Sequence, residues 1–315
     1  MLNLSTIEIV MGLIFIYLLL SILVTVLNEI FVTIISLRGK ILKKAIIQIL
    51  TEKDLIQKFY SHPLIKKFSK GKKIRPSYIS KEIFSKVLID SLNGYKNSDI
   101  IKNVKDSLNK LPKGSEIRKI IETLINDSEN NITKFKENIE NWFNEVMDRV
   151  KGWYIRKNKI IVFTIGMVIT IILNADTIHI AKKVSDDNSA RIKLAELAIV
   201  FVNAESNKNI YSSDSLQIID QPVLNDTAQL NKLDSLMNYT YSFISEHLTE
   251  VHEVLGLGWN SYNQEIDEFE KSKFYFWLLK IFGWLLTATA ISLGSAFWFD
   301  LLQKFVKLRG TGNTK

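Results

Sequence analysis

Apolar residues gather in three long runs, separated by stretches in which apolar and charged residues follow helical spacing. The first run, Ile9 to Leu27, contains no Lys, Arg, Asp or Glu. The second, Ile160 to Leu173, reaches full length only if polar residues up to position 180 are included, and the third, Phe274 to Phe299, contains one charge, Lys280. Because an α-helix needs about 20 apolar residues to cross a bilayer, the pattern predicts three membrane-spanning helices.

The second run is short enough that a buried helix of a soluble domain is an alternative interpretation. A membrane span is favoured because Lys151, Arg156, Lys157 and Lys159 precede the run. Basic residues gather at the cytoplasmic ends of spans, so this end of the second helix is predicted to lie inside.

The net charge of +8 divides unevenly along the chain. Residues 38–159 contain 28 Lys and Arg against 14 Asp and Glu, a net of +14, and residues 175–273 contain 8 against 16, a net of −8. Alternating signs on successive connecting segments are typical of a membrane topology. The amino terminus is therefore expected outside and the carboxyl terminus inside the cytoplasm.

These patterns predict an all-α integral membrane protein with three transmembrane helices, a helical cytoplasmic domain and a smaller helical outer domain. In the cytoplasmic domain, apolar residues at three- and four-residue spacing predict a helix that begins near residue 131 and continues into the second span. The expected segments are an amino-terminal transmembrane helix (1–37), a basic cytoplasmic domain (38–158), a second span (159–180), an acidic outer domain (181–273), a third span (274–299) and a basic cytoplasmic tail (300–315).

Polar residues within the spans are the candidates for function, because an unpaired charge in hydrocarbon costs a few kcal/mol or more. Ser21, Thr25 and Asn28 share one face of the first helix, with Glu29 beside them. Such a stripe could line a pore formed by several subunits, but hydrogen bonding between helices is the commoner use and is favoured here.

Charged residues near the ends of the spans are predicted to form structural ion pairs. Asp176 and His179 share a face near the outer end of the second helix, and Lys280 enters the third helix at a similar depth. We therefore expect an Asp176–Lys280 pair, with a proton relay through His179 as a sharper but less favoured alternative. Glu29 and Asp300 both fall near the inner interface, at the level of the basic residues Arg38, Lys159 and Lys304, and structural ion pairing is expected there too.

Two further groups of residues indicate surfaces rather than chemistry. A row of small residues on the third helix predicts close helix packing, within the protein or between copies; it consists of Gly283, Thr287, Ala290 and Gly294. A basic cluster could meet anionic lipid headgroups, nucleic-acid phosphate or only solvent; it consists of Lys66, Lys67, Lys70, Lys72, Lys73 and Arg75.

The sequence offers no arrangement of residues that indicates catalysis. Cysteine is absent, which excludes disulfides, thiolate metal sites and cysteine nucleophiles. Neither a cofactor motif nor a metal-binding spacing is found, so no catalytic, cofactor or metal residue is predicted, and an enzyme is the least favoured class. Nucleic acid is an unlikely partner, and no small-molecule substrate is indicated.

Several short stretches together resemble a family of bacterial inner-membrane proteins of uncharacterised activity, and the likeness covers nearly the whole chain. They are His62-Pro63-Leu64-Ile65, Pro76-Ser77-Tyr78-Ile79, Asn174-Ala175-Asp176-Thr177, Gly258-Trp259 and Phe297-Trp298-Phe299-Asp300-Leu301-Leu302. The resemblance implies a bacterial inner-membrane location and brings no activity, cofactor or site residue. The expected function is a non-enzymatic membrane protein that acts through self-assembly or partner binding, in contact with membrane lipid; the alternative is an oligomeric pore or a membrane-permeabilising effector.

Overall fold

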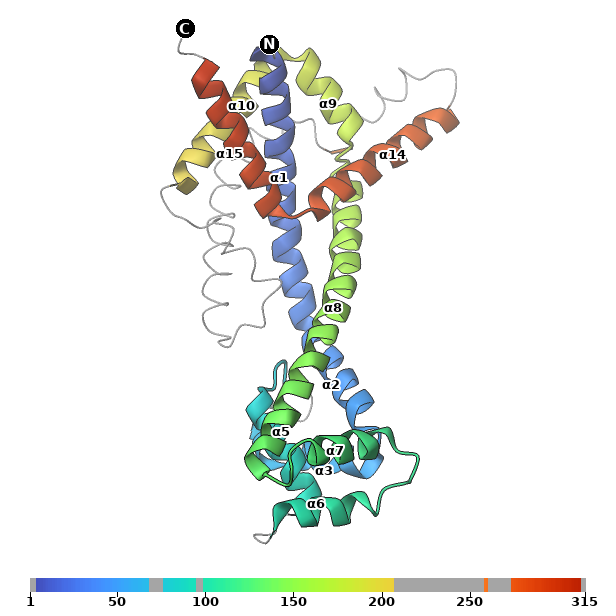
Figure 1. Cartoon of the computed structure of the whole chain (residues 1–315). Helices are drawn as coiled ribbons and strands as arrows, with labels where there is room; N and C mark the ends of the chain where they lie inside the picture. The colour runs from blue at the N-terminus through green and yellow to red at the C-terminus, as the bar shows by residue number, and fades with distance from the viewer. Residues whose placement is uncertain (1–3, 68–75, 95–98, 207–257, 260–272, 313–315) are drawn as a thin grey trace. The chain divides into compact units, whose positions relative to one another are not determined.

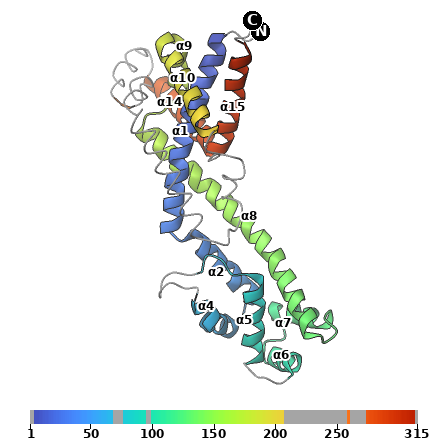
Figure 2. The ribbon, with the colours of Figure 1, turned by 90° about the vertical axis from the view of Figure 1, so that its left-hand side faces the viewer.

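The computed structural model describes residues 4–67, 76–94, 99–206, 258–259 and 273–312, and all regular elements in these ranges are α-helices. The chain divides into two compact units (Figures 1 and 2). Unit 1 contains residues 1–31 and 158–315, and unit 2 contains residues 32–157. The all-helical fold class is therefore correct for the described residues.

Among the residues that the structure describes, two helices are long and apolar enough to cross a membrane. They span Ser5–Ile34 and Phe274–Ser292, and a third candidate is a bent pair of helices, Ile132–Ile172 and Thr177–Asp186. The chain therefore has the composition of a membrane protein with two or three spans.

Unit 2 is a bundle of short helices around an aromatic and aliphatic core. The helices are α2 (Leu37–Leu50), α3 (Lys53–Ser61), α4 (Pro63–Lys67), α5 (Lys81–Asn93), α6 (Ile100–Leu108), α7 (Glu116–Asn126) and the first part of α8 (Ile132–Ile172). Phe84 stacks on Phe143 of α8 with ring centroids 4.1 Å apart. Buried His62 accepts the Leu64 N–H at Nδ1 (3.2 Å) and places Nε2 3.4 Å from Asp90, so the His-Pro-Leu-Ile stretch builds a helix start.

Helix α8 is continuous for 41 residues, which confirms the predicted helix from about residue 131. The expected second span of 159–180 is nevertheless wrong as a single helix. The chain leaves the helix after Ile172, Asn174 takes a left-handed conformation (φ 49°), and α9 (Thr177–Asp186) continues at an angle of 54° to α8. A polar Asn-Ala-Asp sequence therefore breaks the span where a straight helix was expected.

Unit 1 is built around α1 (Leu4–Ile34), whose amino-terminal half is enclosed by other helices of the unit. Helix α10 (Asn188–Ser206) packs on it through Phe201, whose ring lies 5.9 Å from that of Phe15. Residues 181–206 were expected in a separate outer domain. They lie instead against α1, because one side of α10 is apolar and joins the same core.

The expected third span of 274–299 is also wrong as one helix. Helix α14 (Lys273–Ser292) ends at a turn in which Gly294 has φ +92°, and α15 (Ser295–Gly312) then reverses direction. The Trp298 indole N–H donates to the Ala290 carbonyl (2.7 Å) and closes this turn. The conformation of Gly294 is one that glycine adopts without strain, so Gly294 ends a helix rather than packing inside one.

Helix α15 returns along α1, and the first turns of α1 and the last turns of α15 lie side by side (Figures 1 and 2). Arg309 Nη2 lies 3.0 Å from Glu8 Oε1. The first turns of α1 and the last turns of α15 are therefore held together by an ion pair. The basic residues of the tail, 300–315, were the reason for expecting it in the cytoplasm. One of them, Arg309, forms this ion pair with Glu8.

Candidate functional site: buried polar contacts between the apolar helices

The break between α8 and α9 contains a buried polar junction centred on Asp176. Its Oδ1 accepts the N–H of Ile178 (2.8 Å), so the carboxylate caps the start of α9. Its Oδ2 lies 4.0 Å from Lys280 Nζ of α14, and the two residues are 5% and 2% exposed. The structure thus brings together the two residues expected to pair, and each offsets the cost of burying the other.

Gly283 allows α14 to reach this junction. A Cβ atom added at position 283 would overlap Oδ1 and Cγ of Asp176. The carboxylate therefore lies directly on the α14 backbone, one turn after Lys280. Among the small residues predicted for packing, Gly283 has this specific role in a contact between helices.

A chain of hydroxyl groups joins α1, α9 and α14 beside the Asp176 junction. Tyr17 donates to Thr177 Oγ1 (3.0 Å), and the two threonine hydroxyls of Thr177 and Thr287 are 2.8 Å apart. Thr287 donates to the Gly283 carbonyl (2.9 Å) and accepts the Thr177 backbone N–H (3.0 Å). Because each hydroxyl has one proton to donate, the hydrogen bonds run in one direction: Tyr17 donates to Thr177, Thr177 to Thr287, and Thr287 to the Gly283 carbonyl.

The same break holds the Gly258-Trp259 pair. The Gly258 N–H donates to the Leu173 carbonyl (2.8 Å), and the Asn174 side-chain amide donates to the Gly258 carbonyl (2.9 Å). The Trp259 ring then packs edge-on against Trp284 of α14, with centroids 5.9 Å apart. The Leu173 carbonyl and the Asn174 side-chain N–H are thereby hydrogen-bonded within the protein, as lipid requires, whereas the buried Asn174 Oδ1 has no hydrogen-bond partner among the described residues.

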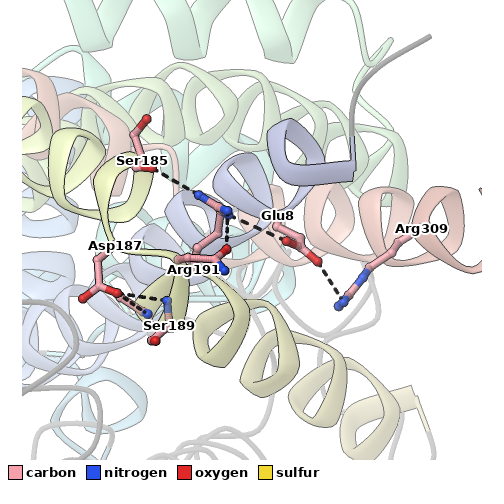
Figure 3. Close-up of polar contacts among 8 residues, drawn as sticks. Glu8, Ser185, Asp187, Ser189, Arg191 and Arg309 are labelled. Carbon is pink, nitrogen blue, oxygen red and sulfur yellow. Dashed lines mark hydrogen bonds and ion pairs between the residues drawn. The ribbon is translucent and has the colours of Figure 1, made fainter.

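A second charged cluster lies at the start of α1 (Figure 3). Glu8, only 7% exposed, lies 3.0 Å from Arg309 of α15 and 3.7 Å from Nε of Arg191 of α10. Arg191 also donates to the Ser185 carbonyl (3.1 Å) and to the side chain of Asn188. The cluster was not predicted, because Arg191 and Arg309 lie 183 and 301 residues from Glu8 and belong to segments that read as separate domains.

Asp187 sets the position of Arg191 in this cluster. Its Oδ1 accepts the backbone N–H groups of Ser189 (2.9 Å) and Ala190 (3.0 Å) and so caps α10 (Figure 3). The cap fixes the first turn of α10, from which Arg191 reaches Glu8. Glu8 therefore ties three helices, α1, α10 and α15, at one level of unit 1.

The predicted polar stripe of the first helix is mostly used in packing. The Ser21 hydroxyl donates to the Ile291 carbonyl of α14 (3.1 Å), and the Thr25 hydroxyl donates back to the Ser21 carbonyl (2.8 Å). Asn28 is 4% exposed, and its Oδ1 has no hydrogen-bond partner in the described part of the chain. Glu29 is only partly buried.

The remaining predicted residues do not form a site within the described ranges. Glu29 and Asp300 were each expected to pair with a basic residue, but neither makes an ion pair within these ranges, and Asp300 is exposed at the surface of α15. His179 lies in the first turn of α9 and is partly buried. Lys66 and Lys67 end α4 with exposed side chains, whereas Lys70, Lys72, Lys73 and Arg75 lie outside the described residues.

No family model, curated protein or solved structure matches this chain. The arrangement of the side chains therefore has to support the functional proposal. In unit 1 that arrangement joins helices: each of the two buried carboxylates, Asp176 and Glu8, is paired with a basic residue from another helix.

Proposed function

We propose that this chain is an integral membrane protein that acts by assembling with a protein partner or with copies of itself, and that unit 1 anchors unit 2 at the membrane. The observation that supports this function most is the use of the polar groups in unit 1. Asp176 and Glu8 are buried, Thr177 is partly buried, and all three bind residues of neighbouring helices. Such contacts suit a rigid anchor, because satisfied buried polar networks hold helices in one arrangement.

The apolar surface of unit 1 supports membrane residence. Large apolar side chains remain exposed along α14, where lipid would cover them at no cost. They include Phe274, Leu278, Ile281, Phe282, Leu285 and Leu286.

Charge supports an orientation with unit 2 in the cytoplasm. The segment 38–159 carries the net charge of +14, and basic segments are retained inside. The resemblance to bacterial inner-membrane proteins supports the inner membrane as the location. In this proposal unit 2 is the part that presents a folded surface to cytoplasmic partners.

Cross-linking in native membranes tests the assembly function. Two differently tagged copies are expressed together, treated with an amine-reactive cross-linker, and purified through one tag. We expect the second tag or a defined protein partner in the purified product. A strictly monomeric species, with neither the second tag nor a reproducible partner, would contradict the proposal. Membranes dissolved in detergent and diluted before cross-linking provide the control for chance collisions.

A pore is the second candidate, and two buried amides favour it. Asn28 of α1 and Asn158 of α8 are 4% and 3% exposed, and neither Oδ1 has a hydrogen-bond partner among the described residues. Buried amide oxygens without a hydrogen-bond partner are costly, and water in a hydrated path would satisfy them.

Ion flux from liposomes tests this second candidate. A pore predicts flux that falls in Asn28→Leu and persists in the matched control Thr25→Val, because the Thr25 hydroxyl bonds only within its own helix. Liposomes that remain tight at every protein density would exclude the pore and leave the assembly function in place.

A further inference from the structure

We propose that the α14–α15 hairpin enters and leaves the membrane on one side, so that both ends of the chain lie on that side and α14 contacts the acyl chains of one leaflet. The inference rests on the membrane residence of unit 1 and goes beyond the assembly function. In this arrangement α14 is a re-entrant helix instead of the expected third crossing.

Contacts along α1 give the depth of the hairpin. Ile291, just before the turn, accepts a hydrogen bond from Ser21, Trp298 lies against Tyr17 (ring centroids 4.8 Å apart), and Arg309 pairs with Glu8. From Glu8 to Ser21 the α1 axis rises about 20 Å, which matches the rise of α15 between its start and Arg309. Helix α15 therefore runs antiparallel to α1, and the turn lies at the level of Ser21.

The turn does not reach the far end of α1. Beyond Ser21, α1 continues to Ile34, a further rise of about 20 Å. Helix α14 ends at Ser292, beside this level, so it stops well short of the end of α1 that leads to unit 2. A helix that crossed the membrane beside α1 would have to continue to that end.

The composition of α15 excludes a return crossing by that helix. Asp300, Lys304, Lys307 and Arg309 fall within its 18 residues, and it does not qualify as a candidate span. Charged residues at mid-membrane are costly, and Arg309, near the carboxyl end of α15, is held beside Glu8 at the start of α1. The chain therefore comes back on the side from which α14 entered.

The exposed side of α14 fits lipid better than a second protein surface. Phe274 is 79% exposed and Phe282 52%, whereas Lys280 and Thr287 turn inward to Asp176 and Thr177 and the exposed Thr289 hydroxyl donates to the Leu285 carbonyl of its own helix. A helix that is apolar on its outer face and polar on its protein face is typical of lipid contact, because polar side chains in a bilayer turn toward protein.

Thiol labelling tests the shared side, and the chain is suited to it because it contains no cysteine. Thr6→Cys, Gly310→Cys and Ser61→Cys each introduce one thiol into the full-length protein, near Glu8, near Arg309 and in unit 2 respectively. A membrane-impermeant maleimide is added to sealed vesicles of one orientation. We expect Thr6→Cys and Gly310→Cys to react in the same preparation and Ser61→Cys only in vesicles of the opposite orientation.

Reaction of Gly310→Cys together with Ser61→Cys, and not with Thr6→Cys, would overturn the inference and leave the assembly function untouched. Reaction of all three thiols from one side would mean that α1 does not cross, which would overturn the inference and the membrane orientation together.

A depth profile along α14 tests the lipid contact. Nitroxide labels at Phe274, Phe282, Leu286 and Leu293 report collision with oxygen and with a water-soluble nickel chelate. A re-entrant helix predicts that oxygen collision rises steadily to Leu293 at the turn, whereas a crossing helix predicts a maximum near Leu285 and a fall on both sides. The second pattern would contradict the inference, as would a disulfide-linked dimer of Phe282→Cys, because a second copy would then cover this face.

Discussion

Replacing Gly283 by alanine gives the sharpest test of the junction between α8, α9 and α14. The new methyl group would overlap the Asp176 carboxylate, which would have to leave its position. Its departure removes the cap of α9, a loss of about 1 kcal/mol. It also leaves Lys280, 2% exposed, without its counter-charge.

The magnitude follows from these two losses and one gain. Breaking a buried ion pair costs about 3–5 kcal/mol, and the 4.0 Å separation of Asp176 and Lys280 places this pair at the low end. Alanine recovers about 1 kcal/mol of helix propensity over glycine. We predict that Gly283→Ala lowers the free energy of unfolding by about 2–4 kcal/mol.

Reversible unfolding by SDS in mixed micelles, followed by circular dichroism, measures this change. Gly310→Ala is the matched control, because it makes the same substitution in α15 at a position with open space around it, and it should leave stability unchanged or slightly raised. In an Asp176→Ala background the methyl group meets no carboxylate, so Gly283→Ala should add almost no further loss. Equal effects of Gly283→Ala and Gly310→Ala would refute the reasoning.

Three further predictions follow from contacts elsewhere in the protein. Thr287→Val removes the acceptor of the Thr177 N–H and should cost about 1–3 kcal/mol in the same SDS assay, with Thr289→Val, whose hydroxyl bonds only within α14, as a near-neutral control. Glu8→Gln leaves two arginines without a counter-charge and should cost about 3 kcal/mol; an unchanged midpoint would show that the cluster is solvated. In unit 2, the Glu82 carboxylate accepts hydrogen bonds from the Glu82 backbone N–H and from the Ser80 side chain, which hold the pKa of Glu82 below its usual 4.5. The charged carboxylate therefore stabilises the fold above pH 4.5, and this stability is lost as the pH falls through the lowered pKa. Thermal unfolding should therefore show a larger stability gap between the protein and Glu82→Gln at neutral pH than in acid, and a gap independent of pH would contradict this.

The sequence predicted the helices better than their interruptions. The apolar run of α1 and the long helix α8 follow from composition and spacing, which act locally along the chain. The break at Asn174 and the reversal at Gly294 do not, because a single polar residue or glycine is compatible with a continuous helix and only the tertiary contacts decide. Each break divides one expected helix into two, α8 and α9 at Asn174 and α14 and α15 at Gly294.

The same distinction applies to the candidate site. Asp176 and Lys280 could be matched from the sequence because both are isolated charges at similar depth in apolar runs. Glu8 was not predicted as a site residue, because it immediately precedes the apolar run that begins at Ile9 and so resembles an ordinary charge at the membrane interface. Its two arginines became partners only through the return of α15 and the docking of α10, which hydrophobic periodicity does not encode.

The bond between Glu8 and Arg309 also bears on the order of events during synthesis. The two residues are 301 positions apart, so Glu8 leaves the ribosome long before its partner has been translated. The Glu8 carboxylate therefore lacks Arg309 while the intervening residues are translated, and α15, which is made much later than α1, completes the cluster. Maturation thus has a late step that a chain truncated before α15 could never reach, however well its first helix is inserted.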